Sequence, residues 1–396
     1  MTTIHSTEPT MMAIDYLYSG LTSPKRVKVV GKSPFSMIDG NLGDAYTAST
    51  MFHYTNDERW WEFLIDQVSS LTSLLRKNRF DQEGLLGGLS GLAFLLNRSK
   101  RNDSDFKRAI DSLLGRINTL TERRLWTVHN SIGVKRENYD FALGLSGTAH
   151  FLFSIGEKGL PLAKKICDEM ADRSKDCFPD CYWTCANDLD SSMVENIPGL
   201  VSGLRDLGFA HGVSSVINTL KCGYQVFNEN RYLHAAEEIC EIFVENIKQN
   251  DGQGISYYEI PSPLQETPLS SPLARQAWCY GIPSLEISIA GLRTLKENIY
   301  SCLEYPNSYF DPIEGHFEDM GLCHGVAGRQ YIADKLQLPV GGTWQVDMRK
   351  HVDSFLTRHQ TETDLSFWHG IAGTLAVTVA IDSKMSYAPA MEVLGV

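Results

Sequence analysis

The segment Gly321-Leu322-Cys323-His324-Gly325-Val326-Ala327-Gly328 ends in a Gly-x-x-Gly unit, and an apolar stretch follows it. Seven such units, with glycine or serine in the last position, occur along the chain, and each precedes an apolar segment. Their first glycines are 44 to 69 residues apart, an interval that holds a helical hairpin and its loops. The units are Gly40/Gly43, Gly88/Gly91, Gly144/Gly147, Gly212/Ser215, Gly281/Ser284, Gly325/Gly328 and Gly370/Gly373.

Two kinds of segment alternate around these units. Segments such as Ile282 to Leu292 and Gly373 to Ile381 are apolar on nearly all sides, which predicts buried helices. Segments such as Asp57 to Arg76 and Tyr232 to Ile247 are charged and amphipathic, which predicts helices with one exposed face. Glycine lets backbones approach closely, so several helix starts can converge. We therefore predict an all-α chain, an α/α toroid of about seven helical hairpins, with its functional cleft where the helix starts meet.

A single domain over residues 1–396 is predicted, because no strong linker interrupts the repeat. Two insertions are expected, at about residues 117–138 and 176–198, and they give the chain a small irregular or extended part. Within the first, Leu125 to Glu137 is expected to form a short strand or an extended loop. Asn250 to Pro272 contains four prolines, which predicts a long loop rather than a regular helix.

The composition excludes several classes of protein. The formal net charge of −12 argues against a nucleic-acid binder, which normally needs a basic face. No stretch approaches the roughly 20 apolar residues of a membrane span. Residues 1–15 lack a basic region followed by an apolar run, so no secretory signal is expected. Nine cysteines without a regular spacing then indicate reduced thiols in the cytosol, some of them metal ligands.

Three metal-capable side chains lie at the starts of predicted helices. Cys279 occurs in Trp278-Cys279-Tyr280-Gly281, and Cys323 and His324 precede Gly325. Two thiolates and an imidazole fill three corners of a tetrahedral zinc site and leave the fourth open for a water or a substrate. Taken alone, Cys279 is better explained as an inert buried cysteine, since free cysteines are commonly buried.

The sequence resembles the lanthipeptide (lantibiotic) synthetase cyclases, the LanC-type family. The resemblance rests on four motifs in matching order, and the glycine repeat extends it from about Gly40 to Gly373. It implies zinc bound by Cys279, Cys323 and His324, with Asp140, His211 and Arg275 beside the metal and Tyr280 close by. The motifs are Tyr139-Asp140-Phe141-Ala142-Leu143-Gly144, Leu207-Gly208-Phe209-Ala210-His211-Gly212, Arg275-Gln276-Ala277-Trp278-Cys279-Tyr280-Gly281 and Cys323-His324-Gly325-Val326-Ala327-Gly328.

The family reaction adds a peptide cysteine thiol to dehydroalanine or dehydrobutyrine in the same peptide, which forms a lanthionine or methyllanthionine ring. The nucleophile must be a thiolate, and zinc coordination deprotonates a thiol at neutral pH. The addition leaves an enolate, so a general acid is needed, and we assign His211 as the acid or base. Asp140 is expected to orient His211, and Arg275 to stabilise the enolate oxygen.

Each of these residues also has a structural interpretation. His211 and Asp140 can act as helix caps, Arg275 can pair with a surface carboxylate, and Tyr280 can be a packing residue. Two further groups are interpreted as structural. The histidines are His150, expected in the core, and His369, which opens the seventh unit. The cysteines are Cys177, Cys181 and Cys185, which no nearby histidine completes as a metal site.

The leading hypothesis is a stand-alone, zinc-dependent cyclase that acts on a dehydrated precursor peptide in the cytosol. A separate dehydratase and an exporter are the expected partners, in a complex that can bring the enzyme peripherally to the membrane. One alternative is a related protein that adds or binds glutathione. A second is a zinc-stabilised scaffold that only binds peptides, although a structural zinc normally takes four protein ligands.

Overall fold

Sixteen α-helices make up most of the computed structural model, which describes residues 8–24, 26, 33–77, 80–102, 104–131, 133–177, 181–189, 191–196, 200–260, 269–304, 319–338, 343–357 and 364–396. The described ranges also contain a three-stranded sheet and short 3₁₀ segments. The all-α prediction is therefore confirmed. None of the helices in the described ranges is long and apolar enough to cross a membrane.

The chain forms two compact units. The first contains Met1–Gln82, Leu86–Ser112 and Phe310–Val396, and the second contains Glu83–Leu85 and Leu113–Tyr309. The single domain predicted over residues 1–396 stays a prediction.

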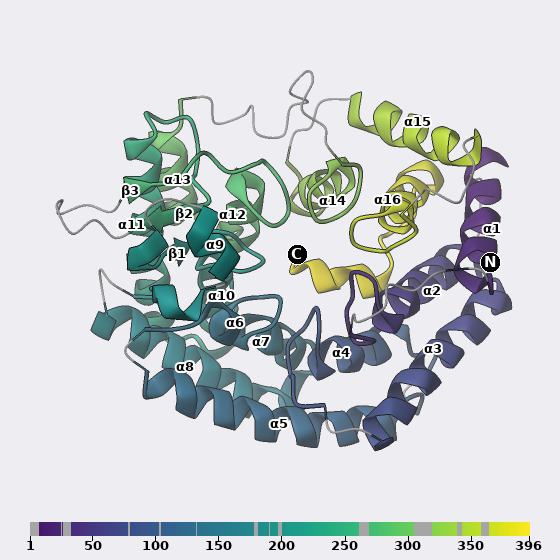
Figure 1. Ribbon diagram of the computed structural model, residues 1–396, viewed down its shortest axis with the longest axis horizontal. Coiled ribbons are helices and arrows are strands. Elements are labelled where there is room, and N and C mark those ends of the chain that lie inside the picture. Colours follow the sequence, from purple (N-terminus) through teal and green to yellow (C-terminus); the bar gives the residue numbers. More distant parts are fainter. Residues whose placement is uncertain are drawn as a thin grey trace. The chain divides into compact units, whose positions relative to one another are not determined.

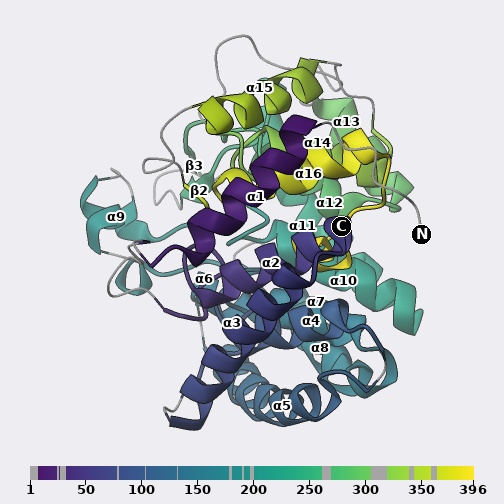
Figure 2. The ribbon, with the colours of Figure 1, turned by 90° about the vertical axis from the view of Figure 1, so that its right-hand side faces the viewer.

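The first unit contains seven complete helices, the start of α5 and a terminal 3₁₀ segment in its described residues. α2 packs along α3 (Figure 1), and α1 lies across α15 and α16 (Figure 2). Its elements are α1 (Glu8–Thr22), α2 (Asn41–Thr55), α3 (Glu58–Lys77), α4 (Leu89–Ser99), α14 (Val326–Leu336), α15 (Thr343–Thr357), α16 (Ile371–Ser383) and η6 (Pro389–Leu394).

The C-terminal segment η6 is packed into this unit. Met391 is fully buried, its carbonyl accepts a hydrogen bond from the Tyr331 hydroxyl at 3.1 Å, and the Tyr54 hydroxyl lies 3.8 Å from its sulfur. Arg98 at the end of α4 pairs with Glu392 at 2.6 Å. The last residues of the chain thus connect α2, α4 and α14.

Met391→Ala should lower the free energy of unfolding by about 2–5 kcal/mol, because it leaves a cavity in a fully buried site. Urea denaturation of the full chain measures this. Met12→Ala is the matched control: Met12 is 47% exposed, so its loss should cost less than about 0.5 kcal/mol. Equal effects of the two substitutions would mean that η6 adds nothing to the core.

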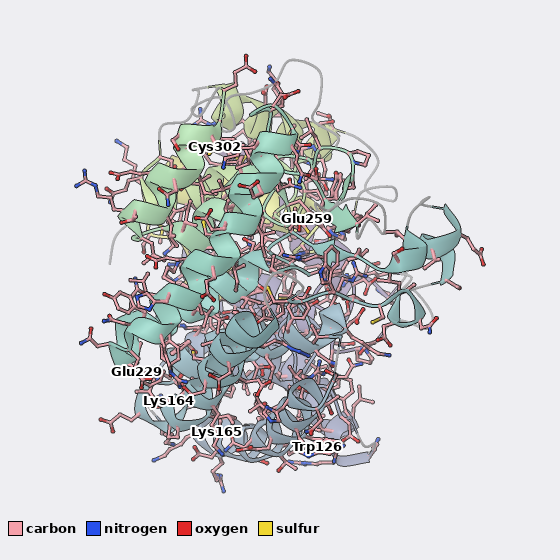
Figure 3. The ribbon with its side chains drawn as sticks, turned by 90° about the vertical axis from the view of Figure 1, so that its left-hand side faces the viewer. Trp126, Lys164, Lys165, Glu229, Glu259 and Cys302 are labelled. Atoms are coloured by element: carbon pink, nitrogen blue, oxygen red, sulfur yellow. The ribbon has the colours of Figure 1, made fainter. Side chains whose placement is uncertain are left out.

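The second unit contains the remaining helices and the sheet. α8 packs against α7, α10 and α11, and Lys164 on α8 pairs with Glu229 just before α11 at 2.7 Å (Figure 3). Its elements are most of α5 (Lys107–His129), α6 (Arg136–Tyr139), α7 (Leu145–Ser154), η1 (Gly156–Lys158), α8 (Leu160–Cys177), η2 (Ala186–Asp188), α9 (Ser191–Asn196), η3 (Leu200–Ser202), α10 (Ser214–Phe227), α11 (Asn230–Gln249), α12 (Gly281–Ile289) and α13 (Arg293–Cys302).

The strand or extended loop predicted at Leu125 to Glu137 is largely wrong. α5 continues through His129, and α6 begins at Arg136. Leu125 and Val128 are buried while Trp126 is 69% exposed, so the buried side chains follow a helical spacing of three. Leu125 to Val128 contains the aromatic and β-branched side chains that favour a strand, but it continues the helix that begins at Lys107.

The expected start of a helix at each glycine unit is found at all seven. α2, α4, α7, α14 and α16 each begin directly after the first glycine of a unit. At Gly328 an added Cβ would overlap the carbonyl oxygen of Leu322, six residues earlier. The repeated glycines are therefore required because the backbone folds back onto each helix start. α10 and α12 begin in the two units that end in serine.

The sheet is small and antiparallel, in the order β1 (Arg205–Asp206), β2 (Tyr258–Ile260), β3 (Leu269–Ser270). Glu259 on β2 (Figure 3) is paired with Arg205 across the sheet, and both side chains are almost fully buried. Burial raises the pKa of the Glu259 carboxyl to about 7, and the charge of Arg205 opposes this.

Because the pKa of Glu259 is higher in the folded chain than the ordinary 4.5, folding favours its protonated form. Its contribution to stability is full below about pH 4.5 and is lost as the pH rises through about 7. We expect Glu259→Gln to remove this loss. The measurement is the free energy of unfolding in urea, for variant and parent, at pH 5 and pH 8. The difference between variant and parent should shift in favour of the variant at pH 8, even if the substitution carries a cost that is the same at both pH values. A difference that is the same at both values would contradict the raised pKa.

Candidate metal centre and its surroundings

Cys279 lies in a tight turn that begins α12. Gly281 has φ of +80°, and the N–H of Ala277 bonds the carbonyl of Tyr280 across the turn at 3.0 Å. The thiol-bearing residue is 2% exposed. Its carbonyl accepts hydrogen bonds from the N–H groups of Phe209 and Ala210, at 2.8 and 3.4 Å. The main chain of Cys279 is thus fixed by the segment that carries His211.

Cys323 and His324 occupy the turn before α14. The N–H groups of Leu322 and Cys323 both bond the carbonyl of Trp368 at 3.0 Å. Cys323 is 6% exposed, and the His324 ring stacks on the His369 ring with 5.0 Å between centroids. His369 is therefore in contact with a predicted site residue, although its sequence context favoured a structural role.

Cys279 lies in the second unit, and Cys323 and His324 lie in the first. Two thiolates with one imidazole are common zinc donors. The donor types therefore fit zinc. Asp319 lies 3.8 Å from Nδ1 of His324, and metal-binding histidines commonly have such a carboxylate nearby.

The structure also brings Asp140 and His211 together. One oxygen of the fully buried Asp140 lies 2.7 Å from Nδ1 of His211. The other accepts the N–H groups of Leu143 and Gly144, at 2.7 and 2.8 Å. Asp140 therefore holds the start of α7 and orients the imidazole as well. A carboxylate only accepts hydrogen bonds, so Nδ1 carries a proton and Nε2 is the atom for acid–base chemistry.

Opposing effects set the pKa of the His211 imidazole. Burial favours the neutral form and lowers the pKa of His211, but the hydrogen bond to Asp140 and the charges of Asp140 and Asp206 raise it. The net result is a pKa above the ordinary 6.5. The side chain is still 43% exposed, so a substrate can reach it. A histidine with these properties is suited to proton transfer near neutral pH.

Arg275 and Tyr280 lie on either side of the Cys279 turn. Arg275 is exposed, and both its main-chain N–H and its Nε donate to the Tyr257 hydroxyl, at 3.1 and 3.2 Å. The Tyr280 hydroxyl instead donates to Asp206 at 2.9 Å. Its pKa is raised well above 10, first by burial and then by the charge of Asp206. Tyr280 thus stays protonated with its hydroxyl directed at a carboxylate.

Sequence reasoning missed Asp206, Arg136 and Tyr257. Asp206 is fully buried and contacts Arg136 at 3.1 Å and Tyr280 at 2.9 Å, residues 70 and 74 positions away. The available signal was its position directly before the apolar run Leu207 to Ala210, because a charged side chain in an apolar run needs a partner when it is buried. Its partners are too distant in sequence to be identified from spacing.

The remaining candidates are not part of this arrangement in the described residues. Cys181 is buried, Cys185 is exposed, and neither belongs to a group of metal-capable residues there. The side chain of Cys177 lies outside what the structure describes. His150 packs its ring against Phe141 with centroids 5.4 Å apart.

These features define a predominantly helical chain with two cysteines and a histidine at its helix starts. The chain belongs to the lanthionine synthetase C-like protein family, whose pattern it matches over residues 31–392.

No curated protein matches the sequence. Among solved structures, nisin cyclase is similar with a TM-score of 0.75 and 16% identity, and the match covers 98% of this chain and 96% of that one. This likeness confirms the predicted α/α toroid fold class. An unsaturated glucuronyl hydrolase from Bacillus sp. GL1 matches over 96% of each chain with 13% identity, but its TM-score of 0.42 is too low to support an argument.

Proposed function

We propose that this protein is a zinc-dependent lanthipeptide cyclase. It adds cysteine thiols to dehydroalanine or dehydrobutyrine within one dehydrated precursor peptide and so forms thioether rings. The observation that carries the proposal is the pair of His211 and Asp140, in a chain that has the zinc-type donors Cys279, Cys323 and His324 at the starts of α12 and α14. Family membership and a fold like that of nisin cyclase support it.

Cys279, Cys323 and His324 would hold the zinc ion. Zinc bound by three protein ligands supplies Lewis acidity at its open position, which lowers the pKa of a substrate thiol. Two thiolate ligands balance the charge of the dication. This donor set therefore leaves a substrate sulfur more nucleophilic than three neutral histidines would.

His211 handles the protons of the addition. Its Nε2 accepts the proton that the substrate thiol loses, and Asp140 holds the resulting imidazolium. The sulfur forms a bond to the β-carbon of the dehydro residue, and the electron pair of the double bond moves to the adjacent carbonyl. The imidazolium then returns the proton to the α-carbon. Atoms and charge balance, and no oxidant or reductant is needed.

Arg275 is assigned to stabilise the enolate oxygen that forms in this step. Tyr257 accepts from its Nε and its main-chain N–H, which fixes the guanidinium relative to the turn that carries Cys279. A cation held in place at a developing negative charge stabilises the transition state more than the substrate. Tyr280 is assigned a supporting role, because its hydroxyl donates to Asp206.

The partners follow from the reaction. The substrate must first be dehydrated, so we expect a separate dehydratase to supply it and an exporter to remove the product. A cytosolic site of action, peripheral to the membrane through such a complex, fits a peptide that is modified before export. The net charge of −12 favours a basic precursor peptide over an acidic one.

The test uses zinc-loaded full-length protein and a dehydrated, cysteine-containing peptide. We expect the free thiols of the peptide to disappear while its mass is unchanged, because cyclisation is an isomerisation. A glutathione adduct formed when glutathione is added would point to thiol transfer between molecules. Binding without loss of thiols would point to a peptide-binding scaffold. Either result would contradict the proposal.

A further inference from the structure

We propose that Asp206 is the positioning residue of this centre, since its carboxylate joins the turn that carries His211 to Tyr280 and to the segment before Asp140. The inference rests on the proposed function and assigns one of its parts. It concerns the second unit alone, where all of these residues lie.

Asp206 uses both carboxylate oxygens. Oδ1 accepts the N–H of Gly208 at 2.9 Å. Oδ2 accepts from Nη1 of Arg136 at 3.1 Å and from the Tyr280 hydroxyl at 2.9 Å. The side chain has no exposed surface. A buried carboxylate without such donors would be very costly, so the three contacts have to form together when the chain folds.

Each donor leads to a residue of the proposed site. Gly208 begins the turn to His211, and the next two N–H groups of that turn bond the carbonyl of Cys279. Tyr280 follows Cys279 directly. Arg136 opens α6, which ends at Tyr139 beside Asp140. One carboxylate thus connects the three chain segments that carry the zinc ligand, the imidazole and its orienting carboxylate.

The turn that runs from Gly208 to Val213 is packed tightly against Tyr280 and Asp206. A Cβ at Gly208 would lie 2.6 Å from the Tyr280 ring, and one at Gly212 would lie 2.6 Å from Oδ1 of Asp206. The N–H of Val213 also bonds the main-chain carbonyl of Asp206 at 2.9 Å. A shift of Asp206 therefore moves His211 and the Cys279 turn. The position of His211 is then set from both sides, by Asp140 and by Asp206.

A buried ion pair alone would not require an aspartate at this position, because such pairs are often replaceable by apolar residues without loss of stability. An asparagine retains one acceptor oxygen for Gly208 but cannot accept from both Arg136 and Tyr280. Asp206→Asn is therefore a small change in shape that removes the connection to the other two segments.

The test compares Asp206→Asn with Glu259→Gln in zinc-loaded, full-length protein. Glu259 is the matched control: it is a buried carboxylate paired with an arginine in the same sheet, and within the described residues no hydrogen bond or ion pair joins its side chain to a site residue. We expect Asp206→Asn to retain zinc and to lower kcat roughly tenfold, the effect of losing a charge-assisted hydrogen bond, with KM changed less than about threefold. Glu259→Gln should keep the kcat of the parent.

A double-mutant cycle separates positioning from general damage. Tyr280→Phe should lower kcat in the parent and add less than about a twofold loss to Asp206→Asn, because both substitutions break the same contact. An unchanged kcat for Asp206→Asn, or losses that multiply independently, would overturn the proposal. If Asp206→Asn does not fold, Arg136→Gln takes its place: it removes another contact of Asp206, so it should lower kcat, and an unchanged kcat would overturn the proposal.

Hydrogen exchange keeps the two proposals distinguishable. If the parent protein does not cyclise the peptide, the proposed function fails, and exchange then decides the role of Asp206. We expect Asp206→Asn to speed amide exchange in residues 207–213 and 277–281 while the interior of α11 stays protected. Unchanged exchange in both segments would show that Asp206 does not position them.

Discussion

Cys279→Ala is expected to abolish zinc binding and cyclisation together. The substitution removes one of two thiolate donors from a group of three, and the two that remain do not make a stable zinc site at neutral pH. Bound zinc should fall from about one ion per chain to near zero. The rate should fall by roughly a thousandfold, because the contribution of a Lewis acid is several kcal/mol. Metal analysis after dialysis and the free-thiol assay measure the two effects.

Cys240→Ala is the control for this experiment. Cys240 is a buried cysteine of α11, and burial raises the pKa of its thiol to about 12, so it stays protonated. Its loss should leave zinc content and rate near those of the parent. If Cys279→Ala kept a full zinc content, or if Cys240→Ala lost zinc as well, the assignment of the ligands would be incorrect.

His211→Ala is expected to separate chemistry from metal binding. The variant should keep its zinc, because His211 is not one of the three proposed ligands. Cyclisation should slow by about 10² to 10⁴, the usual contribution of a general acid–base residue. His234→Ala, an exposed histidine of α11, is the control and should retain the full rate. Normal cyclisation by His211→Ala would remove His211 from the mechanism.

The same histidine predicts the pH dependence of the rate. The hydrogen bond and charge of Asp140 help to raise the pKa of His211 above 6.5, against the effect of burial. Nε2 accepts a proton only in the neutral imidazole, so kcat/KM should fall as the pH drops through this raised value. Asp140→Asn removes the carboxylate, and the fall should move to lower pH. Movement to higher pH would contradict the assigned effect of Asp140.

The helical part of the fold was predictable because its signals are local. The glycine units mark positions where the backbone passes so close that no side chain fits, as at Gly328. In Tyr232 to Ile247 the apolar residues recur at helical spacing, so the sequence itself indicates which face of this helix is buried. The prediction of a strand or extended loop at Leu125 to Glu137 was largely wrong because it rested on Leu125 to Val128, and four residues are too few to distinguish a strand from one turn of helix.

The site was predictable only in part. The motifs contain cysteine, histidine and aspartate side chains, which bind metals or transfer protons. The family resemblance relates these residues to one another: Cys279, Cys323, His324, Asp140 and His211. Asp206 has no such motif. Its role depends on donors about 70 residues away on both sides, and only folding shows that one carboxylate serves both.

X-ray absorption at the zinc edge of the loaded protein tests the central claim most directly. The account predicts two sulfur ligands, one imidazole and one light exchangeable ligand. A spectrum with four protein ligands, or one with fewer than two sulfur ligands, would contradict it.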